Sequence, residues 1–469
     1  MLKRLKIFLF LFLCSCSVGR EYSPPSYLTQ QQLLKEVKIA PSQKLIAKDW
    51  YTIFNDKDLN TLLNYALNHN FTIQQGVEKL KQSRLLLRTQ SKQFFPMLDG
   101  IASYDYNKAN NPRMLTEDTN DFTVGFDVAW ELDIWGKGRY LSEQYFHLMK
   151  NAKFSLDNLK VSLSSEIVSI FINLREAQQK LSIAQKNLKW QKDILQIVQN
   201  KYNSGIADLL SLNEAQYTVE QTSAIIPLLK EEVERYKNSL AVLAGALPSE
   251  MPVNLDKHKS NLVSDTFKYS VKKLYELPLD IIHTRPDILA AEENLQAQHA
   301  VLNQAIANLY PSLNLEASFS YISSAGRQLF NSDNQVYGYS PGLTTPIWHW
   351  KQLINNVDIQ KHIKQEALLN YNESILCALT EIKNALLAIE LSHKANSYTK
   401  NSYSKMQNIM NLTLDKYKNG LINFTDVATA EQNLLESELA LIENNAQILQ
   451  NFVSFYKATG GGYNFRYHK

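Results

Sequence analysis

Residue types that could carry chemistry are present in this chain, but their spacing fits no catalytic or metal-binding site. Nine histidines are scattered over 469 residues, with no pair at i,i+4 and no Cys/His spacing suited to a metal ion. The phosphate-binding loop and the dinucleotide fingerprint do not occur in the sequence, and the Gly-x-Ser-x-Gly pattern at residues 338–342 lies in an alternating segment rather than at the strand-to-helix turn of a nucleophile. Nothing fixes two carboxylates together as an acid–base pair. The sequence therefore predicts no enzyme, no cofactor and no metal site.

One cysteine near the N-terminus does have a reactive context. Three basic residues within the first six are followed by a short apolar stretch, which is the layout of an export signal. The residues Leu13-Cys14-Ser15-Cys16 resemble the cleavage box of bacterial lipoproteins, in which a small residue precedes the cysteine that is acylated. Cys16 fits this pattern better than Cys14, which follows a bulky leucine. We predict a signal peptide over residues 1–15 and lipidation of Cys16; the alternative is an ordinary signal peptide with incidental cysteines.

Composition is that of an ordered chain without a helical membrane span. Charged residues make up 20% and apolar residues 45%, and no stretch after residue 14 approaches the roughly 20 apolar residues that a spanning helix needs. Loss of the signal peptide leaves 46 basic residues against 46 acidic ones, so the charge gives no reason to expect nucleic acid as a partner. Only Cys377 then remains as a free thiol, which an oxidising compartment tolerates if the cysteine is buried in a helix.

A long internal repeat organises the chain. A shift of 215 residues superimposes Pro96 on Pro311, Trp135 on Trp350, Gly205 on Gly420 and Gly245 on Gly460, without an insertion between residues 70 and 247. Such a register over so many residues is not accidental, and the period is far longer than that of small solenoid repeats. The sequence therefore predicts two homologous halves joined by a proline-containing connector.

Each half contains a pair of alternating segments. Even-numbered residues from Phe122 to Leu132 are apolar, whereas Asp127, Glu131 and Asp133 lie among the odd-numbered ones. The same alternation occurs over residues 98–106 and 313–321 and is weaker over 337–348, where Pro341 and Pro346 interrupt strand hydrogen bonding. One apolar and one acidic face suit a wall between lipid and water. A half-buried soluble sheet shows the same alternation.

Two very long helices follow the strands. No proline occurs from Lys137 to Asn203, nor from Gln352 to Asn419, and apolar residues recur in the first stretch about every 3.6 residues. A 67-residue helix extends about 100 Å, more than an ordinary globular domain. Each helix is expected to break at a glycine, Gly205 or Gly420, and to return as a second helix over about 209–247 or 424–457.

The expected division follows from these elements. It comprises the signal peptide 1–15, a lipid-anchored N-terminal segment and equatorial region 16–69, repeat 1 over 70–247 with a β-hairpin 97–133 and a helical tip near 203–212, a connector 248–284, repeat 2 over 285–462 with a β-hairpin 312–348 and a tip near 418–427, and a tail 463–469. The fold class is mainly α with a small β part. Four strands cannot close a barrel and open edges are forbidden in lipid, so membrane-spanning strands would require an oligomer. Three copies supply twelve strands around an axis.

With this repeat, the chain resembles the TolC-like outer-membrane efflux and secretion channels, in particular their lipoprotein branch (the NodT/OprM type). The resemblance covers nearly all of the mature chain. It rests on four features: Trp50-Tyr-x-x-Phe54-x-Asp56, the segment Trp130–Arg139, the segment Arg285–Glu292, and the tip motif Lys-Tyr-x-x-Gly at Lys201, Tyr202 and Gly205 and at Lys416, Tyr417 and Gly420.

The resemblance implies a homotrimer whose twelve-stranded outer-membrane barrel continues into a long periplasmic helical barrel. It implies a passive duct for small molecules in a tripartite efflux system, lipid-anchored in the outer membrane. A periplasmic adaptor protein and an inner-membrane pump would dock at the tips, at the Lys201 and Lys416 motifs. The exported substrate is not written in the sequence.

The resemblance also implies a gate at the tip. Asp426 matches an aspartate of the family's constriction, and Tyr417 matches a tyrosine that links neighbouring helices. Thr429 stands where relatives have a second aspartate, and Ser211, near Asp208, replaces an acidic partner in the first repeat. We hypothesise that Asp426 gives the closed tip a modest affinity for cations; a helix N-terminal acid that favours the helix dipole is the alternative.

Two other functions remain open at this point. A lipid-anchored coiled-coil rod or adhesin would explain the export signal and the long helices, but not the paired strands or the matching glycine breaks. Within the family, the duct could serve type I protein secretion rather than small-molecule efflux.

Overall fold

The computed structural model describes residues 18–23, 50–108, 118–256 and 285–462. Its elements are η1 (Trp50–Phe54), α3 (Lys57–His69), α4 (Phe71–Gln90), β1 (Met97–Lys108), β2 (Asp118–Leu132), α5 (Lys137–Asn203), α6 (Leu209–Ala244), η2 (Pro248–Glu250), α9 (Pro286–Ala307), β3 (Ser312–Ser323), η3 (Gly326–Gln328), η4 (Ser332–Asn334), β4 (Gln335–Thr344), α10 (Trp350–Lys418) and α11 (Phe424–Ala458). The expected fold class, mainly helical with four strands, is confirmed. No helix in the described ranges is both long and apolar enough to cross a membrane.

The chain divides into two compact units, each containing parts of both repeats. The first comprises Met1–Ser26, Lys79–Lys153 and Ala290–Asn372, and the second comprises Tyr27–Glu78, Phe154–Leu289 and Glu373–Lys469. The long helices α5 and α10 contribute residues to both units.

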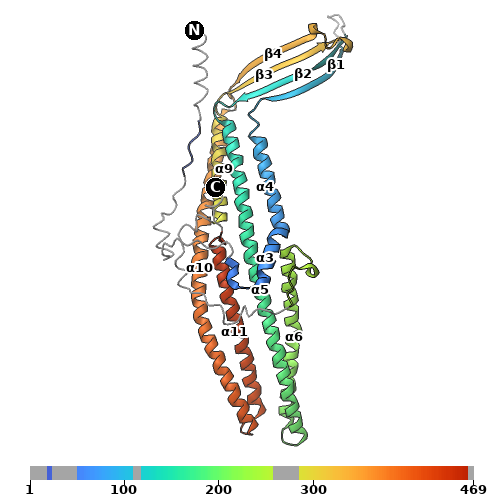
Figure 1. Ribbon diagram of the computed structural model, residues 1–469. Coiled ribbons are helices and arrows are strands. Elements are labelled where there is room, and N and C mark those ends of the chain that lie inside the picture. The colour runs from blue at the N-terminus through green and yellow to red at the C-terminus, as the bar shows by residue number, and fades with distance from the viewer. Residues whose placement is uncertain (1–17, 24–49, 109–117, 257–284, 463–469) are drawn as a thin grey trace. The chain divides into compact units, whose positions relative to one another are not determined.

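The first unit contains one antiparallel sheet of order β1-β2-β3-β4 (Figure 1). The hairpin of repeat 1 pairs β1 with β2, the hairpin of repeat 2 pairs β3 with β4, and β2 joins β3. The fourth strand was predicted to be interrupted by proline, yet β4 runs through Pro341, which lies opposite Leu315. Within one chain β4 is an edge strand, where a proline whose missing N–H faces away from β3 is tolerated. The hairpin expected to end at 348 ends its last strand at Thr344.

Both shorter helices end before the prolines expected to stop them. α4 ends at Gln90, ahead of Pro96, and α9 ends at Ala307, ahead of Pro311. Short-range turns fill the gaps, as in the bonds from Phe95 N to Lys92 O and from Tyr310 N to Ala307 O. The tightened turns leave the residue before each proline free to become extended, as proline requires.

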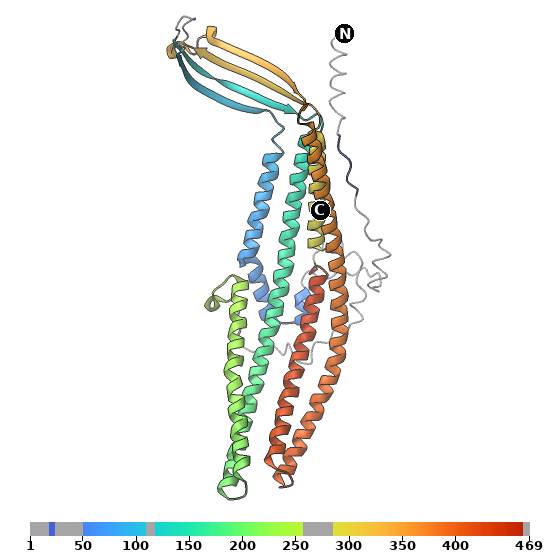
Figure 2. The same ribbon diagram turned by 180° about the vertical axis from the view of Figure 1, so that it is seen from behind.

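The second unit is built around helical hairpins. α5 and α6 run side by side, and so do α10 and α11, in both views (Figures 1 and 2). The α5 helix has the bounds 137–203 expected from the sequence. The α6 helix ends at Gly245 (φ 70°), and a Cβ at this position would lie 2.5 Å from the carbonyl oxygen of His69. Glycine is therefore required where α6 meets α3.

Two buried arginines fix the helices of the second unit. Arg285 donates to Asp287, to Glu381 at 2.7 Å and to the carbonyl of Ala458 at 2.7 Å, so it joins the start of α9 to α10 and α11. Arg175 is 1% exposed and lies 3.6 Å from Asp58. Arg285 is the first residue of one family-like motif, and Arg175 contacts α3, which the Asp56 of another motif caps. The polar residues of these motifs therefore have a structural role.

Candidate functional site: sheet wall, strand-to-helix junction and helical tips

The register of the sheet gives it one apolar face. Leu98 lies opposite Val128, Val128 opposite Ala317, and Ala317 opposite Tyr339. Cross-strand partners share a face, so the alternation in each segment becomes a continuous apolar surface over all four strands. Its side chains are exposed in the protomer, for example Leu98 at 64% and Tyr339 at 85%. An apolar surface of this kind is an interaction surface.

The opposite face carries carboxylates. Asp99 pairs with Asp127, Asp105 pairs with Asp121, and Glu316 lies opposite Ala129. Like charges directly across a strand pair are unfavourable unless water or counter-ions screen them. This face is therefore suited to an aqueous surface. β1 and β4 each pair on one side only among the described residues, so both edges of the sheet remain open to another chain.

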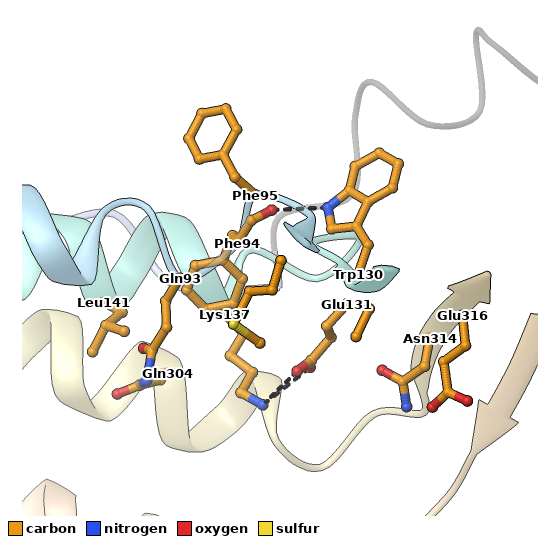
Figure 3. Close-up of a pocket in the computed structure, with 12 residues that line it drawn as sticks. Gln93, Phe94, Phe95, Trp130, Glu131, Lys137, Leu141, Gln304, Asn314 and Glu316 are labelled. Atoms are coloured by element: carbon orange, nitrogen blue, oxygen red, sulfur yellow. Dashed lines mark hydrogen bonds and ion pairs between the residues drawn. The ribbon is translucent and has the colours of Figure 1, made fainter. Parts of the chain in front are cut away.

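A pocket of about 470 Å³ lies where the sheet meets the helices (Figure 3). Aromatic and acidic side chains line it together. Trp130 at the end of β2 donates from Nε1 to the carbonyl of Phe94, 2.8 Å away, and Lys137 at the start of α5 forms an ion pair of 3.0 Å with Glu131 (Figure 3). Both bonds tie the last residues of the strand to the segments before β1 and after β2. The pocket is thus part of the junction between the sheet and the helices.

The segment Trp130–Arg139 builds that joint. Asp133 accepts from the backbone N–H groups of Gly138 at 2.8 Å and Arg139 at 3.1 Å, which satisfies two free donors at the start of α5. Trp135 donates to the carbonyl of Pro311, 2.7 Å away, and stacks on Tyr310. The motif singled out in the sequence therefore turns the chain from strand to helix and connects it to the turn before β3 in the second repeat.

Each helical tip has the same backbone geometry. Gly205 (φ 73°) and Gly420 (φ 72°) have left-handed conformations, and no atom lies within 4 Å of a Cβ built on either. Ile206 N donates to Lys201 O, and Leu421 N donates to Lys416 O, which is the six-to-one bond of a Schellman cap. The Lys-Tyr-x-x-Gly motif is thus a helix-ending turn. Backbone conformation, rather than lack of space, accounts for each glycine.

The two tips contact each other within one protomer. The Nζ of Lys201 lies 4.3 Å from the ring centroid of Tyr417, and Tyr417 packs edge-on against Phe424. Thr425 donates to Glu214 at 2.9 Å, which joins α11 to α6. Beneath these contacts is a tip core of buried side chains from all four helices: Val198, Leu212, Ala215, Met410, Phe424, Val427 and Ala430.

The predicted gate residues are brought near these contacts in different ways. Tyr417 belongs to the inter-repeat contact, and burial raises its pKa. Asp208 caps α6 by accepting from the N–H of Ser211 at 2.9 Å, and this hydrogen bonding lowers its pKa. Thr429 donates to Thr425 O of its own helix. Asp426 is exposed in the first turn of α11. Asp208 and Ser211 are therefore joined to one another as a cap, and their position at a gate remains a prediction.

Sequence reasoning missed one residue of the tip. Glu431 in α11 is 5% exposed, and its Oε1 has no hydrogen-bond partner in the described chain. Burial raises its pKa to about 7, and a hydrogen bond with the buried Gln191 of α5 opposes this shift. The tip core includes Ala430, which precedes Glu431 directly, and Val427, which lies four positions before Glu431. Helical spacing from Val427 was the available indication that Glu431 faces inward.

Two cysteine predictions have different outcomes. Cys16 lies outside the described residues, so its lipidation stays a prediction. Cys377 lies in α10 but is exposed in the single chain, so the condition of burial that would protect a free thiol is not met there. A helix with a narrow apolar stripe leaves the positions outside that stripe exposed, and Cys377 occupies one of these positions. No group of three or more His, Cys, Asp or Glu side chains within the described ranges is arranged to hold a metal.

The chain is similar to known proteins over most of its length. The profile of the family described as "Outer membrane efflux protein" matches residues 62–246 and 277–461, two ranges that are offset by the 215 residues of the repeat. The chain is 26% identical to the cation efflux system protein CusC of Escherichia coli, over 97% of each chain. It is 25% identical to the probable outer membrane lipoprotein SilC of Salmonella typhimurium, over 98% of this chain and 99% of that one.

A solved structure has the same fold. The outer-membrane channel OprN superimposes with a TM-score of 0.88 at 25% identity, covering 96% of this chain and all of that one. Because the family profile covers well over half of the residues, this chain belongs to the outer membrane efflux protein family. It is an outer-membrane efflux channel of the branch predicted from the sequence, and the family favours this function over a rod or an adhesin.

Proposed function

We propose that three copies of this chain form a passive duct across the outer membrane and the periplasm. The observation that carries the proposal is the sheet: one apolar face, one acidic face and two open edges on a four-stranded sheet. Lipid solvates the first face, water the second, and neighbouring copies pair with the edges. Twelve strands then close a barrel, and the long helices continue it into the periplasm.

The helical tips are the proposed docking end. A periplasmic adaptor protein binds around the Lys-Tyr-x-x-Gly turns, at Lys201, Tyr202, Gly205, Lys416 and Gly420, and an inner-membrane pump supplies the energy. The lysine and the backbone turn that recur at both tips support this placement, because they present similar surfaces six times around a trimer. Small molecules pass along the axis of the duct as the pump delivers them.

The tip contacts are the proposed closing device. Tyr417 and Lys201 join the two hairpins of one protomer, and Asp426 and Thr429 form a constriction that is less acidic than in relatives with two aspartates. Acylation of Cys16 anchors the N-terminus in the outer membrane. The similarity to a probable outer membrane lipoprotein supports this anchor.

The assembly is tested by extracting the full chain from outer membranes and running it unheated and heated on a denaturing gel. We expect a heat-labile band at the mass of a trimer, and co-purification of an adaptor protein after cross-linking. A chain that runs as a monomer after gentle extraction and cross-linking would contradict the duct, because the sheet edges would then lack partners.

A further inference from the structure

A second pocket of the first unit has a chemical character different from that of the strand-to-helix junction. It has a volume of about 460 Å³ and lies between α9, α10 and the N-terminal residues around Arg20. Its apolar floor comes from both helices and includes Leu302, Ile306, Val357 and Leu368. Three cationic side chains line it, those of Arg20, Lys361 and Lys364, and none of its lining residues is acidic. An apolar floor beneath several cations fits an amphiphilic anion.

The cations are close enough to affect one another. Lys364 is half-buried, and burial, together with the charge of Arg20, lowers its pKa. Neither Arg20 nor Lys364 forms a side-chain ion pair with another described residue. Lys361 is exposed and forms an ion pair of 2.8 Å with Asp358, so its charge is partly balanced. Two like charges held near each other without an acid are stabilised by an anion between them.

The backbone of Arg20 is held firmly in place. Its carbonyl accepts from Nδ2 of Asn303 at 3.0 Å and lies 2.8 Å from Nε2 of His299, while its N–H donates to Oδ1 of Asn303 at 3.2 Å. His299 is 3% exposed and Asn303 is 2% exposed. The preceding residue, Gly19, donates to the hydroxyl of Tyr140, 2.8 Å away. These bonds fix the backbone of Arg20 beside the pocket that its side chain lines, and guanidinium groups match phosphate oxygens in geometry.

The pocket also lies at a defined distance from the strands. From Leu302 to the end of α9 at Ala307 the helix rises about 7.5 Å, and a short turn then leads to the first residue of β3, Ser312. Ile347 and Trp348, between β4 and α10, are 80% and 98% exposed, as expected for side chains at the membrane–water interface. If the strands span the membrane as proposed above, the pocket lies on the periplasmic side of the strand ends, where the headgroups of the periplasmic leaflet begin.

We propose that this pocket binds the headgroup of an anionic phospholipid, with Arg20 and Lys364 contacting the phosphate and the apolar floor contacting the upper acyl chains. The predicted lipid anchor, Cys16, is four residues from Arg20, at most about 14 Å along an extended chain. The pocket and the anchor therefore both fasten the same N-terminal segment to the same leaflet. The proposal rests on the proposed placement of the strands in the membrane, but not on conduction.

The test is native mass spectrometry of the purified, delipidated full-length protein with phosphatidylglycerol or with phosphatidylethanolamine of the same acyl chains. We expect phosphatidylglycerol to be retained preferentially. Arg20→Gln and Lys364→Gln should each weaken its apparent affinity about fivefold, as expected for one basic side chain near a lipid phosphate. Lys351→Gln, an exposed lysine of α10 outside the pocket, should leave it unchanged.

Three results would overturn the lipid site. They are equal retention of the two lipids, an unchanged affinity in Lys364→Gln, and full displacement by millimolar inorganic phosphate, which would indicate a site for free phosphate. Circular dichroism of each variant confirms that it is folded. Conductance of the same preparations in neutral bilayers separates the two proposals, because a chain that conducts without retaining phosphatidylglycerol contradicts only the lipid site.

Discussion

The ammonium group of Lys201 lies 4.3 Å from the centre of the Tyr417 ring, and this contact joins the tip of repeat 1 to the tip of repeat 2. Both residues occupy the same motif, but at different positions: lysine contributes from the first copy and tyrosine from the second. A repeat of 215 residues therefore places two copies of one motif where they bind each other. The two hairpins can separate only if this contact breaks.

Loss of the cation at Lys201 should loosen the tip. Lys201→Met keeps the apolar stem but removes an interaction of about 0.5–1 kcal/mol at a half-exposed site. We expect single channels of the variant to be open for a larger fraction of the time. Lys416→Met, an exposed lysine of the partner motif, is the matched control and should behave as the wild type. Equal open fractions in all three proteins would show that the contact does not hold the tip closed.

Asp426 should determine how cations block the channel. Three copies of an exposed carboxylate around one axis raise the local affinity for cations. Asp426→Ala should therefore reduce block by divalent cations in single-channel recordings, whereas Asp415→Ala, an exposed aspartate of α10, should not. Unchanged block in Asp426→Ala would leave this residue with only the role of a helix N-terminal acid.

Glu431 should make the stability of the tip depend on pH. Burial raises its pKa from 4.5 to about 7, so the folded chain binds this proton more tightly than the unfolded chain. Its contribution is complete below about pH 4.5 and is lost as the pH rises to 7, up to about 3 kcal/mol. Glu431→Gln should remove this dependence, seen as a smaller fall in the thermal unfolding midpoint between pH 5 and pH 8. Glu436→Gln, an exposed control, should retain the wild-type fall. An identical pH profile in Glu431→Gln would show that the carboxyl is solvated.

Gly138 should be indispensable at the strand-to-helix junction. A Cβ at this position would lie 2.1 Å from the ring of Phe94, whose carbonyl accepts the Trp130 bond. Gly138→Ala should therefore destabilise the protein by about 1–3 kcal/mol. Gly100→Ala serves as the comparison, because its nearest neighbour would be 3.9 Å away, an ordinary contact. Thermal unfolding in detergent measures both, and equal midpoints would contradict the packing of Phe94 against α5.

The periodic elements were predictable from the sequence, and the contacts between them were not. The bounds of α5 followed from an unbroken 3.6-residue pattern, and the strand faces from strict alternation. Hydrophobic pattern does not report on partners that lie far apart in the chain, so the Lys201–Tyr417 contact needed the folded structure. Local chemistry also misled once: Pro341 suggested an interrupted strand, but its place at the sheet edge removes the conflict.

The central claim is that this chain forms a water-filled pore, and reconstitution of the purified trimer into planar bilayers tests it most directly. We expect discrete single-channel steps that prefer cations, because carboxylates line the polar face of the sheet. Asp99→Asn together with Asp127→Asn should reduce that preference without abolishing the steps. A folded, membrane-inserted trimer that passes no current, even after Lys201→Met, would contradict the account.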